Sequence, residues 1–265
     1  IQVANNNALG AAGSVGTIVG TGAALEINGS STALTIPEAI TINGTGLSNG
    51  GAIRLVSGAN AATLSGTITV ASASRINTDI SSGTNTLTIT GNITNDAGLT
   101  FGTISNGNIS VSGIISGSSS SNSNITKDGH ATTGILLLSG ANTYAGTTSV
   151  TAGVIQIASN DALGTLSGSQ GTIVGTGAAI QISGASTLTI PEAFNLNGSG
   201  ISSGGAIRLV GTSAAATLTG GLTAQTASRI NTDATTGTNT LTISTTGITN
   251  TAGITFGVTS AGSIN

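Results

Sequence analysis

The sequence contains no cysteine, methionine or tryptophan, and its 265 residues include one histidine, one tyrosine and three phenylalanines. Without cysteine, the chain has neither a disulfide framework nor a thiolate metal site. Only 5% of its residues are charged, against about 25% in an average globular domain. Serine, threonine, asparagine and the backbone must therefore provide most of the polar surface.

Basic residues are especially few, and the net charge is -3. A nucleic-acid-binding surface needs a cationic face that neutralises phosphates, so we expect no nucleic-acid partner and no binding to lipid phosphates. No apolar run approaches the roughly 18 residues of a membrane-spanning helix, so we expect no direct membrane insertion in this segment. The five basic residues are Arg54, Arg75, Lys127, Arg208 and Arg229.

Short aliphatic runs are what the chain has instead. Hydrophobic residues make up 37% of the sequence, there are 42 glycines, and the mean hydropathy is +0.36. A disordered Gly- and Ser-rich segment would lack such apolar content. The Ile, Val, Leu and Ala runs therefore indicate β-strands separated by Gly, Asn and Ser turns.

A long internal repeat organises the sequence. LTIPEA occurs at 34 and 188, GGAIRLV at 50 and 204, ASRINTD at 73 and 227, and GTNTLTI at 83 and 237, so each pair is 154 residues apart. We predict one continuous segment over 1–265, with a first unit at about 1–154 and a partial second unit at about 155–265. IQVANNNALG at 1–10 matches the end of a unit, so we expect the chain to be a window on a longer array.

A shorter period of about 22 residues lies within the long repeat, and apolar residues alternate with polar ones inside each run. Such coils of short strands predict an all-β fold, a parallel β-helix (β-solenoid) in which each coil pairs with the next. The alternative is a string of antiparallel β-sandwiches of about 100 residues each. The two interleaved series that set the period are Ile53, Ile76 and Leu99, and Ile68, Ile89 and Val111.

One stretch, LSGANTYAGTTSVTAGVIQIASNDALGT at 138–165, resembles the passenger-associated repeat of bacterial autotransporters. The resemblance implies a right-handed parallel β-helix on the bacterial outer cell surface. One departure is the single Gly146, where many such repeats have a glycine pair. The matching residues are Leu138, Gly140, Asn142, Thr143, Tyr144, Gly146, Thr147, Gly153, Ile155, Ile157, Ala162, Leu163 and Gly164.

The same stretch has a purely structural interpretation. Its aliphatic residues supply strands, whereas Asn142 and Tyr144 suit a corner that needs a side-chain hydrogen bond and an amphipathic cover. The alternative is that Tyr144 stacks on a carbohydrate. Phe101 and Phe256 occupy equivalent positions in AGLTFG and AGITFG, which points to the core.

Catalytic residues are hard to place. Lys127, Asp128 and the only histidine, His130, lie in a polar segment that we predict to protrude as a loop at 116–133; it is either a solvated insertion or a functional loop. A nucleophile needs a base within reach, and glycoside cleavage needs paired carboxylates. No two acids are adjacent, so we predict no catalytic, cofactor or metal site. The acids are Glu26, Glu38, Asp79, Asp96, Asp128, Asp161, Glu192 and Asp233.

Two acidic residues recur in the second unit, where Glu38 and Asp79 reappear as Glu192 and Asp233. Each aspartate follows an arginine by 25 residues, Arg54 in the first unit and Arg208 in the second. This is about one coil, so we predict ion pairs between neighbouring coils, each contributing tenths of a kcal/mol.

The expected function is a non-enzymatic structural stalk or adhesin segment of a long repetitive extracellular protein. Its expected partners are neighbouring repeats, copies of itself end to end or side by side, and a host or neighbouring-cell surface. The alternative is a self-assembling filament or surface-layer subunit, because open β-edges pair with another copy unless they are capped. A glycan-binding or glycan-cleaving β-helix is a third hypothesis, which the shortage of aromatic residues disfavours.

Overall fold

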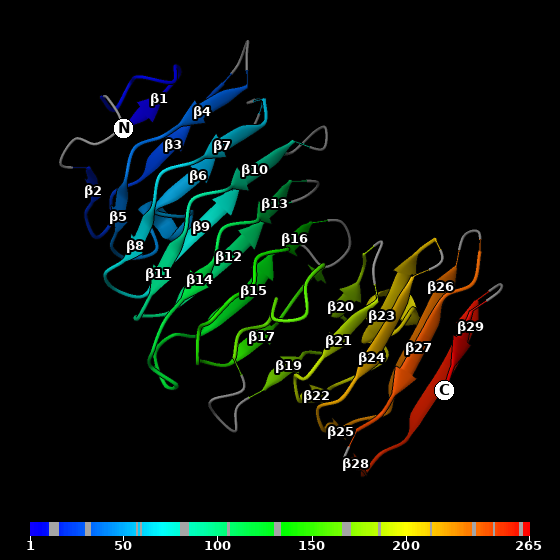
Figure 1. The fold of residues 1–265 in the computed structure, drawn as a ribbon. Coiled ribbons are helices and arrows are strands. Elements are labelled where there is room, and N and C mark those ends of the chain that lie inside the picture. The colour runs from blue at the N-terminus through cyan, green and yellow to red at the C-terminus, as the bar shows by residue number, and fades with distance from the viewer. Residues whose placement is uncertain are drawn as a thin grey trace.

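The computed structural model describes residues 1–10, 16–29, 33–56, 58, 60–79, 85–104, 107–129, 134–165, 171–184, 187–212, 214–234, 237–245, 247–259 and 262–265. Within them the fold is a stack of short parallel strands with almost no helix. Figure 1 shows the strands side by side from the blue N-terminal end to the red C-terminal end, with the two termini at opposite ends of the stack.

Two long sheets run the length of the molecule. In spatial order, sheet A contains β1 (Gln2–Val3), β3 (Leu25–Ile27), β6 (Ile53–Leu55), β9 (Ser74–Thr78), β12 (Leu99–Thr103), β15 (Ile125–Gly129), β17 (Thr148–Val150), β19 (Thr172–Val174), β22 (Phe194–Leu196), β25 (Leu222–Ala224) and β28 (Ile248–Asn250). Sheet C contains β4 (Leu34–Ile36), β7 (Ala62–Leu64), β10 (Thr86–Ile89), β13 (Asn108–Val111), β16 (Ile135–Leu138), β18 (Val154–Ile157), β20 (Ala179–Ile182), β23 (Ile207–Gly211), β26 (Ser228–Ala234) and β29 (Ile254–Thr259).

Two shorter sheets share the third side of the coil. Sheet B holds β2 (Thr17–Val19), β5 (Ile40–Ile42), β8 (Ile68–Val70), β11 (Ile93–Asn95) and β14 (Ile115–Ser116). Sheet D holds β21 (Leu188–Ile190), β24 (Ala215–Leu218), β27 (Thr240–Ile243) and β30 (Ser263–Ile264). From β3 to β14 the chain visits sheets A, C and B in turn, and from β19 to β30 it visits A, C and D. A three-sided coil therefore results.

All of these strand pairs are parallel, which confirms the predicted β-solenoid and excludes antiparallel sandwiches for the described residues. The coils number about nine and are about 25 residues long, somewhat longer than the expected 22. The 22-residue step does occur, for instance from Thr172 to Phe194. Other steps reach 28, as from Leu25 to Ile53, because some corners contain extra residues.

Alternation within each strand builds one continuous core. Inward residues stack in columns along the axis, and the column through Leu25, Ile53, Ile76 and Phe101 is fully buried. Branched aliphatic side chains fit a pleated surface and pack on the coils above and below. A single coil could not bury its apolar face, so the coils depend on one another for stability.

Glycine is required at the corner that follows sheet C. A Cβ at Gly66 would lie 2.0 Å from the carbonyl oxygen of Glu38, and one at Gly91 would lie 1.9 Å from that of Gly66. In the second unit Gly220 has the same arrangement at the corner that follows sheet D, where a Cβ would lie 2.0 Å from the carbonyl oxygen of Glu192. Successive coils approach too closely at these corners for any side chain.

A short 3-10 turn recurs in both units, as η1 (Leu47–Asn49) and η2 (Ile201–Ser203). In each turn two successive non-glycine residues adopt a left-handed conformation: φ is 51° and 59° at Ser48 and Asn49. The conformation is unusual for non-glycine residues, and its recurrence shows that the repeat encodes it.

The stretch that resembles the passenger-associated repeat lies where sheet B ends. Residues 139–147 and 158–171 contain no strand among their described residues, although their backbone still stacks between coils. The Thr143 amide donates to Ile115 at 2.9 Å, and the Thr165 amide donates to Tyr144 at 3.1 Å. The third side of the coil is thus continued by hydrogen-bonded turns until sheet D begins.

The second unit is displaced by one side of the coil. The counterpart of β3 is β20, which carries the matching residues 155 positions later, yet β3 lies in sheet A and β20 in sheet C. Six steps through sheet A lead from β3 to β19, and β20 is the next strand along the chain. A repeat therefore spans six coils and one further side, a rotation of a third of a turn.

Candidate functional site

Charged side chains form a ladder on the outer face of sheet A. Arg54 on β6 donates through Nε to Asp79 Oδ2 at 2.8 Å and through Nη1 to Glu26 Oε1 at 3.1 Å. Its two partners lie on the coils before and after its own. The predicted pair between Arg54 and Asp79 is confirmed, and Glu26 extends it.

The second unit carries the counterpart of this ladder on sheet C. Arg208 Nε donates to Asp233 Oδ2 at 2.6 Å, so this predicted pair is confirmed as well. Gln181 stands beside Arg208 where Glu26 stands beside Arg54. The second ladder therefore has one carboxylate fewer.

The ion pair of a third arginine, Arg75, was not predicted. Arg75 on β9 binds Asp128 on β15 in a bidentate manner, with Nη1 to Oδ2 at 2.6 Å and Nη2 to Oδ1 at 2.7 Å. Strand β12 lies between them, and its Gly102 leaves room because a Cβ there would be 2.0 Å from Arg75 Nη2. The recurring Phe-Gly pair was the available signal, but a reach across two coils could not be read from spacing.

Lys127 and Asp128 do not lie in a protruding loop, as expected for 116–133. Residues 125–129 form β15 in sheet A because Ile125 and Lys127 continue its inward columns. The Lys127 ammonium is buried and donates to Thr103 Oγ1 at 2.9 Å and to the Asp128 carbonyl at 2.6 Å. Burial lowers the pKa of Lys127 to about 8. His130 lies outside the described residues.

Tyr144 and Asn142 are both buried at the corner after β16. The Tyr144 hydroxyl shares a 2.7 Å hydrogen bond with Thr148 Oγ1, and Asn142 bridges two coils by accepting from Ile115 N at 2.8 Å and donating to the Ala162 carbonyl at 2.7 Å. Desolvation raises the pKa of Tyr144 above its usual value. This supports the structural interpretation, because a buried ring cannot stack on a carbohydrate.

Glu192 is a third buried ionisable group, after Lys127 and Tyr144. Its Oε1 accepts a hydrogen bond from Thr172 Oγ1 at 2.9 Å, and burial raises its pKa to about 7. Glu38, its counterpart in the first unit, is also buried. The recurrence of the Pro-Glu pair pointed to a scaffold role, but the sequence did not predict that the carboxyl groups would be buried.

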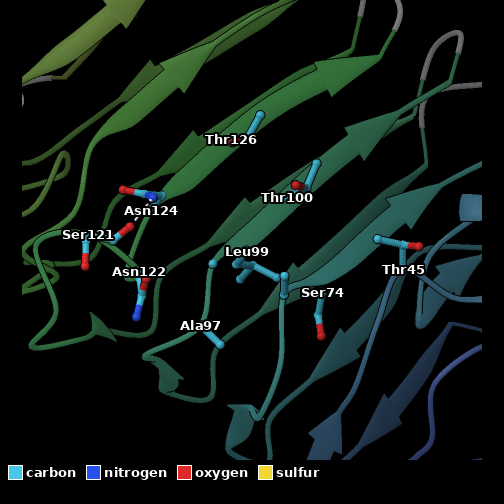
Figure 2. A pocket seen from close by; sticks show the side chains of 11 residues that line it. Thr45, Ser74, Ala97, Leu99, Thr100, Ser121, Asn122, Asn124 and Thr126 are labelled. Atoms are coloured by element: carbon cyan, nitrogen blue, oxygen red, sulfur yellow. Dashed lines mark hydrogen bonds between the residues drawn. The ribbon is translucent and has the colours of Figure 1, made fainter.

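A shallow polar groove crosses the starts of β9, β12 and β15 and encloses about 320 Å³. Figure 2 shows Thr45 on one side and Asn122 and Asn124 on the other, with Ser74 and Leu99 between them. Asn124 is fixed by a 2.8 Å bond from Nδ2 to the Ser121 carbonyl. Hydroxyl and amide groups dominate its lining, and no aromatic ring contributes.

Most of the acids are committed to structural contacts. Four belong to the ion pairs, Glu38 and Glu192 are buried, and Asp96 accepts a hydrogen bond from the Ser118 amide at 2.9 Å. Within the described ranges, no three acidic, histidine or cysteine side chains are grouped so that they could hold a metal ion. No described helix is long and apolar enough to cross a membrane.

Comparison of the chain with models of protein families, with curated proteins and with solved structures finds no match.

Proposed function

We propose that this chain is a non-enzymatic structural segment of a long, repetitive bacterial surface protein, a right-handed β-helical stalk that holds other parts of the protein away from the cell. The observation that carries this proposal is the unbroken pairing of sheet A, which continues through eleven strands and across both units. The resemblance of residues 138–165 to a passenger-associated repeat supports the extracellular location.

The mechanical argument follows from the pairing pattern. Each coil donates and accepts backbone hydrogen bonds along the axis, so bending or stretching the stack must strain many bonds together. Among the described residues, the buried apolar side chains from Val3 to Leu241 form one cluster. The outer surface has few charges and many small polar side chains, so neighbouring rods could pack side by side with little charge repulsion.

A structural role also fits the use of the ionisable groups. Glu26, Asp79 and Asp233 neutralise arginines on neighbouring coils, and Asp128 neutralises an arginine two coils away. A general acid or base needs a pKa near the working pH and access to substrate. Lys127 and Glu192 have shifted pKa values but lie inside the stack, so desolvation explains the shifts without a catalytic role.

The test is the native protein on its cells. Protease shaving of intact cells followed by mass spectrometry should release peptides of this segment, and electron microscopy of the purified segment should show rods. The intact native chain should have a mass of hundreds of kilodaltons. If protease released peptides of this segment only after the cells had been lysed, the protein would be cytoplasmic and the proposal would be contradicted.

A self-assembling filament is the second candidate. It is favoured by the parallel pairing of strands along the axis, because strands of separate chains can stack in the same way. In that case the native chain would have a mass near 25 kDa, and sedimentation velocity would show growth of long polymers with concentration.

Glycan binding is favoured only by the polar groove of Figure 2. Tight and selective signals on a glycan array, lost in a Thr126→Val and Asn124→Ala double variant, would place it ahead of the stalk.

A further inference from the structure

The junction between the two units lacks a strand ladder on the third side of the coil. Sheet B ends at β14 and sheet D begins at β21, and two successive coils lie between them. The described residues of these coils on that side, 139–147 and 158–165, form turns. Isolated hydrogen bonds therefore replace a ladder here, and a segment held by fewer backbone bonds opens at a lower free-energy cost.

Buried polar side chains cross the same coils inside the core, and we call them the junction cluster. The Tyr144 hydroxyl shares its 2.7 Å hydrogen bond with Thr148 Oγ1. Thr148 pairs in register with Thr172 on the next coil, and Thr172 Oγ1 donates to Glu192 Oε1 at 2.9 Å. None of the four is more than 6% exposed. Such a buried polar network is stable only while each of its members is satisfied.

No described cation compensates a charge on Glu192. The turn at 139–147 brings Tyr144 towards it, β17 and β19 bring the uncharged Thr148 and Thr172, and the following corner brings Gly220. Burial, and to a smaller extent the Glu192 charge, raise the pKa of Tyr144.

The basic side chains are all engaged elsewhere, and the Asp161 side chain in the second turn is exposed. An ionised Glu192 would therefore be a buried charge with one hydrogen bond from Thr172, which is unfavourable. The engaged bases are Arg54, Arg75 and Arg208 in ion pairs, Lys127 with Thr103 and a backbone carbonyl, and Arg229 with Asn231.

We propose that the junction between units is a pH-sensitive hinge, in which the turns at 139–147 and 158–165 open locally and the opening releases the proton of Glu192. The neutral carboxyl group keeps the junction cluster closed, and the carboxylate favours the open, hydrated form. The inference concerns the segment itself and applies to a stalk and to a filament subunit alike.

The direction of the pH dependence follows from the two states of Glu192. Burial raises its pKa to about 7 in the closed junction, against 4.5 for a solvated glutamate. The open form binds the proton less tightly, so the opening constant should rise by about tenfold per pH unit between these two values and level off above pH 7. The junction is therefore held most firmly in acid.

The repeat encodes the second of these turns. Residues 1–10 match 155–164 in sequence, and the asparagine of each copy accepts a hydrogen bond from a backbone amide 29 residues further on. The bonds run from Thr35 N to Asn6 Oδ1 and from Thr189 N to Asn160 Oδ1, both at 2.9 Å. Hinges at such turns would divide a longer array into stiff units of six coils and one further side.

The experiment is native-state hydrogen exchange of the 265-residue chain between pH 4.5 and 8, at several low denaturant concentrations. The junction amides of Thr143, Ala145 and Thr165, which donate to neighbouring coils, are compared with those of β10 and β13. After correction for intrinsic exchange, protection of the junction amides should fall about a hundredfold from pH 5 to 7 and depend weakly on denaturant, as local opening does. The β10 and β13 amides should be better protected at every pH and depend steeply on denaturant.

Three variants separate the proton from the rest of the cluster. Glu192→Gln should keep the protection seen in acid up to pH 7, whereas the matched control Glu26→Gln should lose it as the unchanged chain does. Tyr144→Phe removes one hydroxyl group from the cluster and should lower junction protection about fivefold at every pH, with the same slope.

Tyr144 also reports opening without any substitution, because it is the only tyrosine. Its rate of nitration, relative to that of a free tyrosine amide at the same pH, should rise about a hundredfold from pH 5 to 7. A flat ratio would overturn the proposal. Equal protection and equal denaturant dependence of the junction and β10 amides would overturn it too, since only global unfolding would then occur. A fall that persists in Glu192→Gln would assign the proton to another group and refute the hinge as proposed.

Discussion

The two units of the repeat place matching strands on different sides of the molecule. β9 and β26 share the sequence Ser-Arg-Ile-Asn-Thr, yet β9 lies in sheet A and β26 in sheet C. Each nevertheless follows the strand with the sequence Ile-Arg-Leu and precedes the strand containing Thr-Phe-Gly. The environment of a strand is therefore set by the coils before and after it, and the side of the rod that it occupies is free to change.

Because the second unit is rotated relative to the first, equivalent surface groups lie on different sides of the rod. The ladder around Arg54 faces outward from sheet A, whereas the ladder around Arg208 faces outward from sheet C. A partner that recognised either ladder would meet the two copies on adjacent sides of the rod. Three such repeats would span nineteen whole coils, so a fourth repeat would again begin on the same side of the rod as the first.

The largest difference in stability loss between equivalent substitutions in the two units is expected at Phe101 and Phe256. Phe101→Ala should cost about 4 kcal/mol because the ring is fully buried. Phe256→Ala should cost about 1 kcal/mol because half of the ring already contacts solvent. Hydrogen exchange of the adjacent strands measures both values, and equal losses would mean that β29 is covered in solution.

The pH dependence of stability should reveal Glu192. Its folded-state pKa of about 7 lies above the unfolded value of 4.5, so the unfolded chain releases this proton first as the pH rises. The free energy of unfolding should therefore fall between about pH 4.5 and 7, by on the order of 3 kcal/mol. Glu192→Gln should flatten denaturant titrations across this window, whereas Glu26→Gln should leave the slope in place. If the free energy of unfolding of Glu192→Gln fell with pH as steeply as that of the unchanged chain, burial of the Glu192 carboxyl group would be contradicted.

Corner glycines should respond alike in the two units. Gly66→Ala and Gly220→Ala should each cost about 2 kcal/mol or more, because the new methyl group would meet a carbonyl oxygen of the preceding coil. Gly247→Ala is the control, since no atom lies within 4 Å of its Cβ position. Thermal unfolding measures all three. A clear difference between Gly66 and Gly220 would show that the side of the rod does influence the corner.

The smallest effects are expected in the ion-pair ladders. Arg54→Gln should lower stability by about 1 kcal/mol or less, and Arg208→Gln by a few tenths, because Arg54 has two carboxylate partners and Arg208 one. Both losses should shrink in high salt, which screens partly exposed charges. Denaturant unfolding at low and high salt measures them, and a larger loss for Arg208 would reverse the comparison.

Much of the architecture could be predicted because it is periodic. Recurrence of LTIPEA and ASRINTD indicated the long repeat, the alternation around Arg54 indicated which residues face outward, and a separation of 25 residues indicated the ion pairs. The sequence was misleading at Lys127, which was predicted to lie in a loop. A single lysine in a polar segment gives no sign that its neighbours continue the columns of a sheet.

The sequence by itself determined the composition of each strand, the repeat and the parallel stacking, because these depend on residues that recur at nearly fixed intervals. Only the tertiary structure decided the rotation of the second unit, since that depends on one repeat spanning six coils and one further side. It also decided the bond from Arg75 to Asp128, which needs Gly102 on the intervening coil. Contacts along the axis of a solenoid join residues tens of positions apart, and spacing alone does not say which of them meet.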